Sequence, residues 1–138
     1  MSGIFALDPR LAAESVFVAD RGLCRVLLMD DARYPWLLLV PRRAGLVELF
    51  DLDVPARAQL WDELDQTSRA LRAAARFDKL NVGALGNVVR QLHVHVVGRR
   101  AGDAAWPRPV WGHGTRAPYA DAARAALVDT LRMRLAED

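Results

Sequence analysis

The sequence is poor in cysteine. Cys24 is the only cysteine among 138 residues, so no disulfide can form within one chain. This fits a reducing compartment, and we expect a cytoplasmic protein. Cys24 lies in an apolar stretch, where a thiol usually packs as a small buried hydrophobic group.

Long apolar runs are also missing. The longest candidate, residues 36–40, is far shorter than the ~20 residues that a membrane-spanning helix needs. The N-terminus has neither the basic start nor the apolar run of a secretory signal peptide. We therefore expect no membrane partner.

The net charge is small. Nineteen basic and 17 acidic residues leave a formal charge of +2, which gives little reason to expect a specific nucleic-acid partner. The hydrophobic share of 52% is enough for a substantial core. With no internal repeat or low-complexity tract, residues 1–138 are predicted to form a single domain.

The order of the predicted elements is typical of an α+β fold. Strands are predicted from apolar and β-branched runs at residues 15–20, 24–29, 36–40, 77–84 and 88–97. A short helix is predicted at 11–14 after Asp8 and Pro9, a long one at 55–76 and a last one at 118–136. We expect a five-stranded antiparallel sheet with a long central helix and a C-terminal helix.

Two of the three histidines lie in the predicted strand 88–97. Side chains of a strand alternate between two faces, so Gln91, His93 and His95 share one face. The other face carries Leu92, Val94 and Val96. Positions two apart are roughly 6.6–7 Å apart, which suits two imidazoles that bind one small anionic group or one metal ion. An ordinary surface strand shows the same alternation, so the residues alone leave both interpretations open.

Residues 91–97, Gln-Leu-His-Val-His-Val-Val, resemble the signature of the histidine triad (HIT) family, which is His-x-His-x-His with apolar residues between and after. Upstream, Asn-Val-Gly at 81–83 and Gly-Asn-Val-Val at 86–89 stand in the order of the family's Asn-x-Gly and Gly-Gln-x-Val. Downstream, Trp-Pro at 106–107 resembles a pair found in some branches. The resemblance covers residues 15–111. Two features depart from the family: Gln91 stands where the first histidine is usual, and the loop between Gly83 and Gly86 is short.

The resemblance implies a HIT-like fold, a nucleotide substrate, a homodimer, and no metal or other cofactor. It implies a nucleotide phosphohydrolase or nucleotidyl transferase that acts at the α-phosphate through a nucleotidyl-histidine intermediate. Dinucleoside polyphosphates and nucleoside phosphoramidates are the expected substrates. His93 would be the nucleophile, with its second ring nitrogen protonated and held by an acceptor such as a backbone carbonyl. His95 would donate to a phosphate oxygen.

The resemblance also suggests roles for polar residues around the histidines. Gln91 cannot titrate near neutral pH, so we expect it to support the strand edge or the orientation of His93. Asn87 would contact the phosphate or the leaving group. Asn81 would lie at the rim of the nucleotide pocket, or merely cap a turn. Arg99, like Arg100 after it, would attract polyphosphate or be only solvated.

The remaining candidates are apolar or aromatic. Leu28 and Leu38, together with Val40, are expected to form the apolar base or walls of the pocket under the nucleoside. Trp106 and Trp111 are expected to shape the pocket or a dimer contact. His113 has no partner at a diagnostic spacing and is interpreted as a histidine whose hydrogen bonds are satisfied or that lies at the surface.

Two other functions remain open. His-x-His on a strand is also a metal-ligand spacing, and a metal-dependent enzyme would need further ligands from His113, Cys24 or a carboxylate. Alternatively, Gln91 marks a triad that has lost turnover, in which case the protein is a non-catalytic nucleotide-binding or regulatory module.

Overall fold

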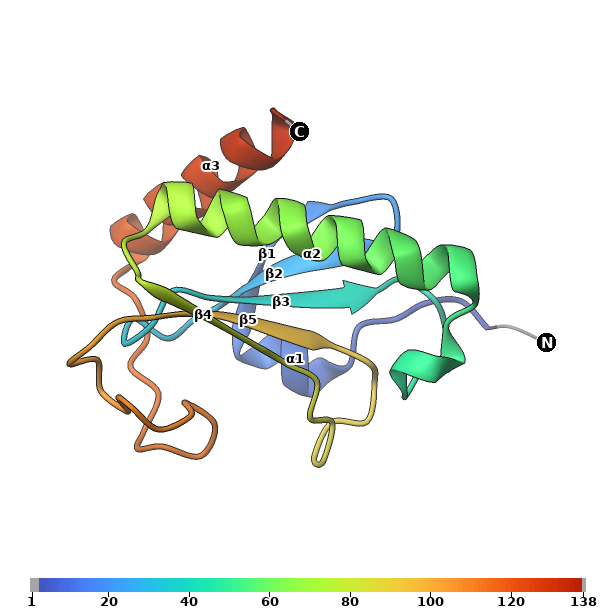
Figure 1. The fold of residues 1–138 in the computed structure, drawn as a ribbon, viewed down its shortest axis with the longest axis horizontal. Coiled ribbons are helices and arrows are strands. Elements are labelled where there is room, and N and C mark those ends of the chain that lie inside the picture. Colours follow the sequence, from blue (N-terminus) through green and yellow to red (C-terminus); the bar gives the residue numbers. More distant parts are fainter. Residues whose placement is uncertain (1–2, 138) are drawn as a thin grey trace.

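The computed structural model describes residues 3–137 and contains one five-stranded antiparallel sheet (Figure 1). Its strands are β1 (Ser15–Asp20), β2 (Cys24–Met29), β3 (Trp36–Pro41), β4 (Lys79–Gly83) and β5 (Val94–Arg99). The helices are α1 (Pro9–Ala13), α2 (Val54–Ala74) and α3 (Asp121–Ala136), with a 3-10 helix η1 at Leu49–Asp51. The strand order is β1-β2-β3-β5-β4. The predicted α+β class, with its antiparallel sheet, long helix and C-terminal helix, is confirmed.

The sheet separates two apolar cores. On one face, side chains such as Leu39, Val94 and Val96 pack with Leu60 and Leu71 of α2. On the other face, apolar side chains of the central strands pack with α1 and with the chain that follows β5; they include Leu27, Trp36, Leu38, Val40 and Val97. Because β2, β3 and β5 are buried on both faces, they provide a rigid floor for groups that project from them.

The long helix α2 begins at a strong N-terminal signal. The Asp53 carboxylate accepts a hydrogen bond from Ala56 N, and Pro55 occupies the first turn. Further along, the buried Glu63 carboxylate accepts hydrogen bonds from the backbone N–H groups of Leu23 and Cys24. These bonds tie α2 to the start of β2. None of the helices in residues 3–137 has the length and apolar character needed to span a bilayer.

The strand predicted at residues 88–97 is wrong in its start, because β5 begins at Val94. β4 ends at Gly83, which pairs with His95, and the last pair of β3 with β5 is Leu39 with Val94. Although β3 itself continues to Pro41, the residues before Val94 pair with neither β3 nor β4 and form a loop, here called the 84–93 loop. His93 directly precedes the strand, and its side chain still points to the same face as that of His95, since both line one cleft.

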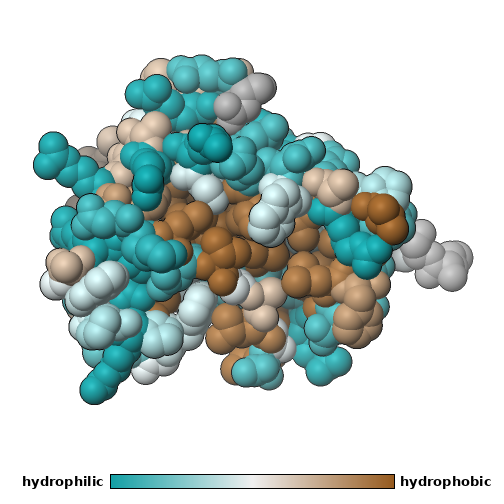
Figure 2. Space-filling view, viewed as in Figure 1, coloured by the Kyte–Doolittle hydropathy of each residue, from teal (hydrophilic) through white to brown (hydrophobic). Residues whose placement is uncertain are grey.

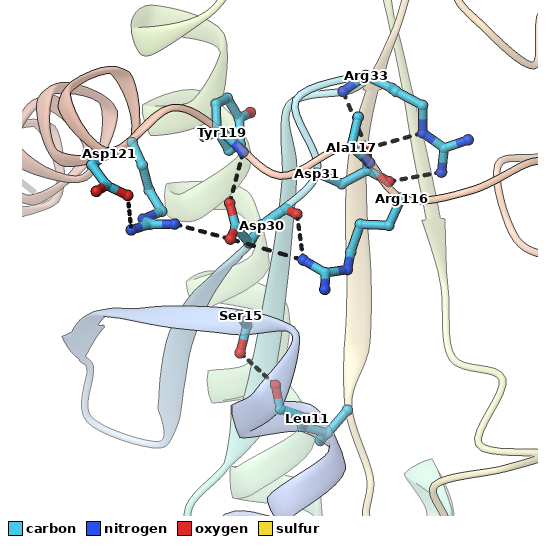
Figure 3. A network of polar contacts seen from close by, with 10 residues as sticks. Leu11, Ser15, Asp30, Asp31, Arg33, Arg116, Ala117, Tyr119 and Asp121 are labelled. Carbon is cyan, nitrogen blue, oxygen red and sulfur yellow. Dashed lines mark hydrogen bonds and ion pairs between the residues drawn. The ribbon is translucent and has the colours of Figure 1, made fainter.

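A polar network fixes the chain that leads into α3 (Figure 3). Asp30 accepts hydrogen bonds from Tyr119 N and from Arg124, while Asp31 binds Arg33 and accepts a hydrogen bond from Ala117 N. These residues join the β2–β3 turn to a segment more than 80 positions away in the sequence. The irregular chain after β5 is thereby held against the face of the sheet that carries the histidines.

The two edges of the sheet differ. At the β1 edge, Arg132 of α3 donates hydrogen bonds to the carbonyl oxygens of Phe17 and Val18. At the β4 edge, Val82 is 46% exposed, and Leu85 just beyond the strand is 44% exposed. Apolar side chains gather on this side of the molecule, below α2 (Figure 2). The β4 edge therefore presents an apolar surface, whereas a guanidinium covers backbone carbonyls of β1.

Candidate active site

A cleft of about 580 Å³ lies on the face of the sheet opposite α2 and α3. Its floor comes from the central strands, and its walls come from α1, the 84–93 loop and the chain after β5. The residues that line it include Leu11, Met29, Leu38, Asn87, His93 and His95. The volume is typical of a site for a small organic ligand, roughly 300–1,000 Å³.

His93 is the last residue before β5, and the residue is 6% exposed. Its Nδ1 lies 2.6 Å from the backbone oxygen of Gln91. Because a carbonyl oxygen only accepts hydrogen bonds, Nδ1 must carry the proton, and Nε2 of neutral His93 holds the free lone pair. The expected backbone acceptor for His93 is therefore present, and it comes from the residue two positions earlier.

His95 is fixed in the opposite tautomer. Nε1–H of Trp36 donates to Nδ1 of His95 over 3.1 Å, so Nε2 of neutral His95 carries the proton. Burial, with a smaller contribution from neighbouring His93, lowers the pKa of His95 from 6.5 to about 3. His95 is thus an uncharged hydrogen-bond donor at neutral pH.

The two imidazoles are adjacent and enclosed by aromatic rings. Their ring centroids are 5.0 Å apart with an edge-to-face arrangement. The Trp111 ring lies 5.3 Å from His95 on one side, and the Trp36 ring lies 5.7 Å from it on another. This packing leaves His95 little rotational freedom, and both histidines line the same cleft.

The predicted strand required Gln91 to share a face with His93 and His95. In the structure it does not. It lies in the 84–93 loop and is not among the residues that line the cleft. Its Oε1 accepts a hydrogen bond from Asp8 N, and its Nε2 donates one to Ala6 O, both over 2.8 Å. Its side chain holds the N-terminal segment, while its backbone oxygen orients His93.

Leu38 and Asn87 line the cleft as expected, but Leu28 does not. Leu28 pairs with Leu37 and packs in the helix-side core, whereas Leu38 pairs with His95 across the sheet. Directly paired residues share a face, so Leu28 and Leu38 point in opposite directions. The neighbouring Met29 takes the position in the cleft that was assigned to Leu28. Val40 lies in the core on the cleft side but does not line the cleft.

Arg99 and Asn81, which were expected to contact the nucleotide, bind each other in the structure. Arg99 is 1% exposed and forms two hydrogen bonds, of 2.7 and 2.9 Å, with the Asp103 carboxylate. A third bond, of 2.9 Å, runs from its Nη1 to Oδ1 of Asn81. A buried guanidinium requires such partners, and neither Arg99 nor Asn81 lines the cleft. Arg99 also lowers the pKa of Asp103 through its hydrogen bonds.

The aromatic candidates and His113 divide between the cleft and its surroundings. Trp111 lines the cleft, whereas Trp106 lies beside buried Arg99, with its ring 5.6 Å from the guanidinium. His113 is half-buried outside the cleft, and its carbonyl accepts a hydrogen bond from Arg33. His113 therefore lies apart from the two catalytic candidates.

Three lining residues from α1, namely Arg10, Leu11 and Glu14 at its end, were missed by sequence reasoning. They lie about 80 positions from His93 in the sequence, and no local pattern connects the two regions. Trp36 was missed as well, although strand alternation puts it on the same face as Leu38.

The chemistry of the donor set bears on the metal hypothesis. Within residues 3–137, no three His, Cys, Asp or Glu side chains lie together in a group that could hold a metal ion. The pair His93 and His95 therefore lacks a third protein ligand of these types in the part of the chain described.

Comparisons with known proteins give a consistent result. The family model described as "HIT domain" matches residues 10–102. A histidine triad protein from Bradyrhizobium japonicum is 46% identical, with a TM-score of 0.93, over 96% of this chain and 99% of that one. A histidine triad protein from Sinorhizobium meliloti is 42% identical, with a TM-score of 0.91, over 94% and 96% of the two chains. One from Marinobacter aquaeolei is 40% identical, with a TM-score of 0.93, over 98% of each chain. The search among curated proteins found no match.

Proposed function

Because the chain belongs to the HIT domain family, we propose that it hydrolyses or transfers nucleotides at the α-phosphate through a nucleotidyl-His93 intermediate. The observation that carries this proposal is the 2.6 Å contact between Nδ1 of His93 and the Gln91 carbonyl oxygen. This contact fixes the tautomer with the proton on Nδ1. The lone pair of Nε2 is then free, as a nucleophilic imidazole needs.

The reaction has two displacements at phosphorus. In the first, Nε2 of His93 forms a bond to the α-phosphorus, and the bond to the leaving group breaks with its electron pair going to the leaving group. The imidazole becomes cationic, so its Nδ1–H bond to the Gln91 carbonyl becomes stronger. In the second displacement, an oxygen of water or of another acceptor forms a bond to phosphorus and loses its proton to solvent, and the bond to Nε2 breaks with its electron pair returning to His93. Neutral imidazole suits both steps because it is a good nucleophile and a good leaving group.

His95 is suited to stabilise the charge on the phosphoryl oxygens. Its Nε2–H is available to donate, since Nδ1 already accepts from Trp36. A donor that is fixed in advance and shielded from water lowers the barrier more than a mobile one. Asn87, exposed in the cleft wall, offers an amide to the phosphate or to the leaving group.

The nucleoside would occupy the apolar part of the cleft. Met29 and Leu38 form an apolar floor close to the histidines, and Leu11 of α1 and Val89 of the 84–93 loop add to the walls. A base and ribose would bury apolar area there while the phosphate reaches His93 and His95. Dinucleoside polyphosphates and nucleoside phosphoramidates both present an α-phosphate bound to such a nucleoside.

We also propose a homodimer that forms through the β4 edge. Arg132 already occupies carbonyl oxygens at the β1 edge, whereas Val82 and Leu85 leave apolar area exposed at the β4 edge. Figure 2 shows an apolar surface below α2, on the same side of the molecule, which supports a contact through this edge. Burial of such a surface would stabilise the pair.

The experiment that tests the catalytic proposal compares wild-type protein with His93→Ala. Each is incubated with a dinucleoside polyphosphate and with a nucleoside phosphoramidate, and turnover and acid-labile nucleotidylation of the protein are measured. Loss of the nucleophile should lower turnover by roughly a thousandfold or more and abolish the adduct. His113→Ala, which removes a histidine outside the cleft, is the matched control and should keep wild-type turnover.

Each contrary result has a definite meaning. Wild-type turnover by His93→Ala would show that another group is the nucleophile. Tight nucleotide binding by the wild type without product would instead favour a non-catalytic binding module. Circular dichroism of His93→Ala verifies that the substitution leaves the fold intact.

A further inference from the structure

Gln91 connects two parts of the cleft that are distant in sequence. Its side chain binds Ala6 and Asp8, whereas its backbone oxygen binds His93. The N-terminal segment and the candidate nucleophile are therefore held by different groups of one residue. A substitution of the Gln91 side chain would therefore remove the bonds to Ala6 and Asp8 but leave the backbone contact with His93 in place.

The segment that Gln91 holds leads directly into α1. Asp8 is the N-cap of this helix, and its carboxylate accepts a hydrogen bond from Arg10 N. Five residues are far too few for a helix that is stable by itself, so its position depends on tertiary contacts. Leu11 is the only residue of α1 that is buried.

The position of α1 matters because this helix forms one wall of the cleft. Arg10, Leu11 and the adjacent Glu14 all line it. A second link between α1 and the 84–93 loop runs from Arg10 Nη1 to Val88 O over 3.2 Å, and it is exposed to solvent, as is the bond from Gln91 Nε2 to Ala6 O. The two bonds of Gln91, each 2.8 Å long, are the shorter links between these segments.

The side-chain amide suits this task. It accepts from Asp8 N and donates to Ala6 O at the same time, which fixes both the position and the rotation of the segment. Alanine at position 91 would lose both bonds, while its backbone oxygen would still accept from Nδ1 of His93.

We propose that Gln91 is a positioning residue that holds α1 against the 84–93 loop and thereby determines nucleotide affinity rather than the rate of the chemical steps. The inference rests on the proposed function only in taking a nucleotide as the ligand of the cleft. The residue acts through the wall of the cleft and does not touch the reacting atoms.

The test compares wild type, Gln91→Ala and Gln66→Ala. Gln66 of α2 is the matched control. Its half-buried side chain accepts a hydrogen bond from Arg21, and it does not line the cleft. Binding of adenosine monophosphate is measured by calorimetry, kcat and KM by substrate turnover, and the mobility of residues 6–12 by amide hydrogen exchange.

For Gln91→Ala we expect weaker binding and a higher KM, each by roughly five- to tenfold, the size expected for the loss of such hydrogen bonds. The kcat should stay within about twofold of wild type, because substrate that has bound meets an unchanged His93. Exchange in residues 6–12 should become faster, and Gln66→Ala should match wild type in all three measurements.

Two results would overturn the inference. One is a fall in kcat at unchanged KM, which would mean that the side chain acts on the chemistry. The other is unchanged exchange in residues 6–12 together with unchanged nucleotide affinity. Binding and exchange need no turnover, so an inactive wild type would refute the proposed function while these two measurements still decide the role of Gln91.

Discussion

The buried His95 should make the protein less stable in mild acid. Its pKa is lowered from 6.5 to about 3 by burial and by His93, so the folded protein resists a proton that the unfolded chain binds. Between these two values, acid therefore favours unfolding. The contribution should be fully present above about pH 6.5, decline as the pH falls, and level off below about pH 3.

The size of the effect follows from the shift. Each pH unit inside this window should remove about 1.4 kcal/mol from the free energy of unfolding. Between about pH 7 and about pH 5, the protein should lose about 2 kcal/mol through His95 alone. This interval lies above the range in which most carboxylates titrate, so they contribute little to the change.

Urea unfolding of wild type and His95→Gln at several pH values isolates this contribution. Glutamine does not titrate, and its amide oxygen can still accept from Nε1–H of Trp36. The difference in unfolding free energy between the two proteins should change by about 2 kcal/mol over the interval. Equal losses in both proteins would refute the view that burial keeps His95 uncharged, and with it the role of His95 as a neutral donor.

Two more predictions concern Arg99 and the β4 edge. Arg99→Met should lower the free energy of unfolding by about 3–5 kcal/mol in urea titrations, because Asp103 would stay buried without its partner, while nucleotide KM should change little. A raised KM at unchanged stability would instead show that Arg99 binds polyphosphate. The control for Arg99→Met is Arg100→Met, at an exposed position. Val82→Lys should convert the dimer to monomer in sedimentation velocity, since a charge would enter the contact, whereas Val54→Lys, at an exposed position on α2, should not. A monomeric wild type would contradict the proposed dimer.

Some of the site could be predicted from the sequence because it depends on local geometry. Strand alternation is a property of consecutive residues, so the spacing of His93 and His95 was enough to put both rings on one face. The apolar runs of the central strands and the Asp-x-Pro start of α2 likewise carry their structural meaning within a few residues.

Tertiary structure decided everything that depended on a distant partner. β5 starts at Val94 because no earlier residue pairs with β3 or β4, and Leu28 faces away from the cleft because of its pairing with Leu37. Alternation within one strand does not say which face meets the helices, so the choice between Leu28 and Met29 could not be made locally.

The roles of the polar residues likewise depended on distant partners. Arg99 is buried because Asp103 and Asn81 meet its guanidinium, and Gln91 holds a segment more than 80 residues earlier. The residue types were visible in the sequence, but their partners were not, because a polar side chain takes its role from whatever the fold brings within hydrogen-bond distance. Sequence alone thus determined which face the histidines share, and the packing of the chain determined which side chains surround them.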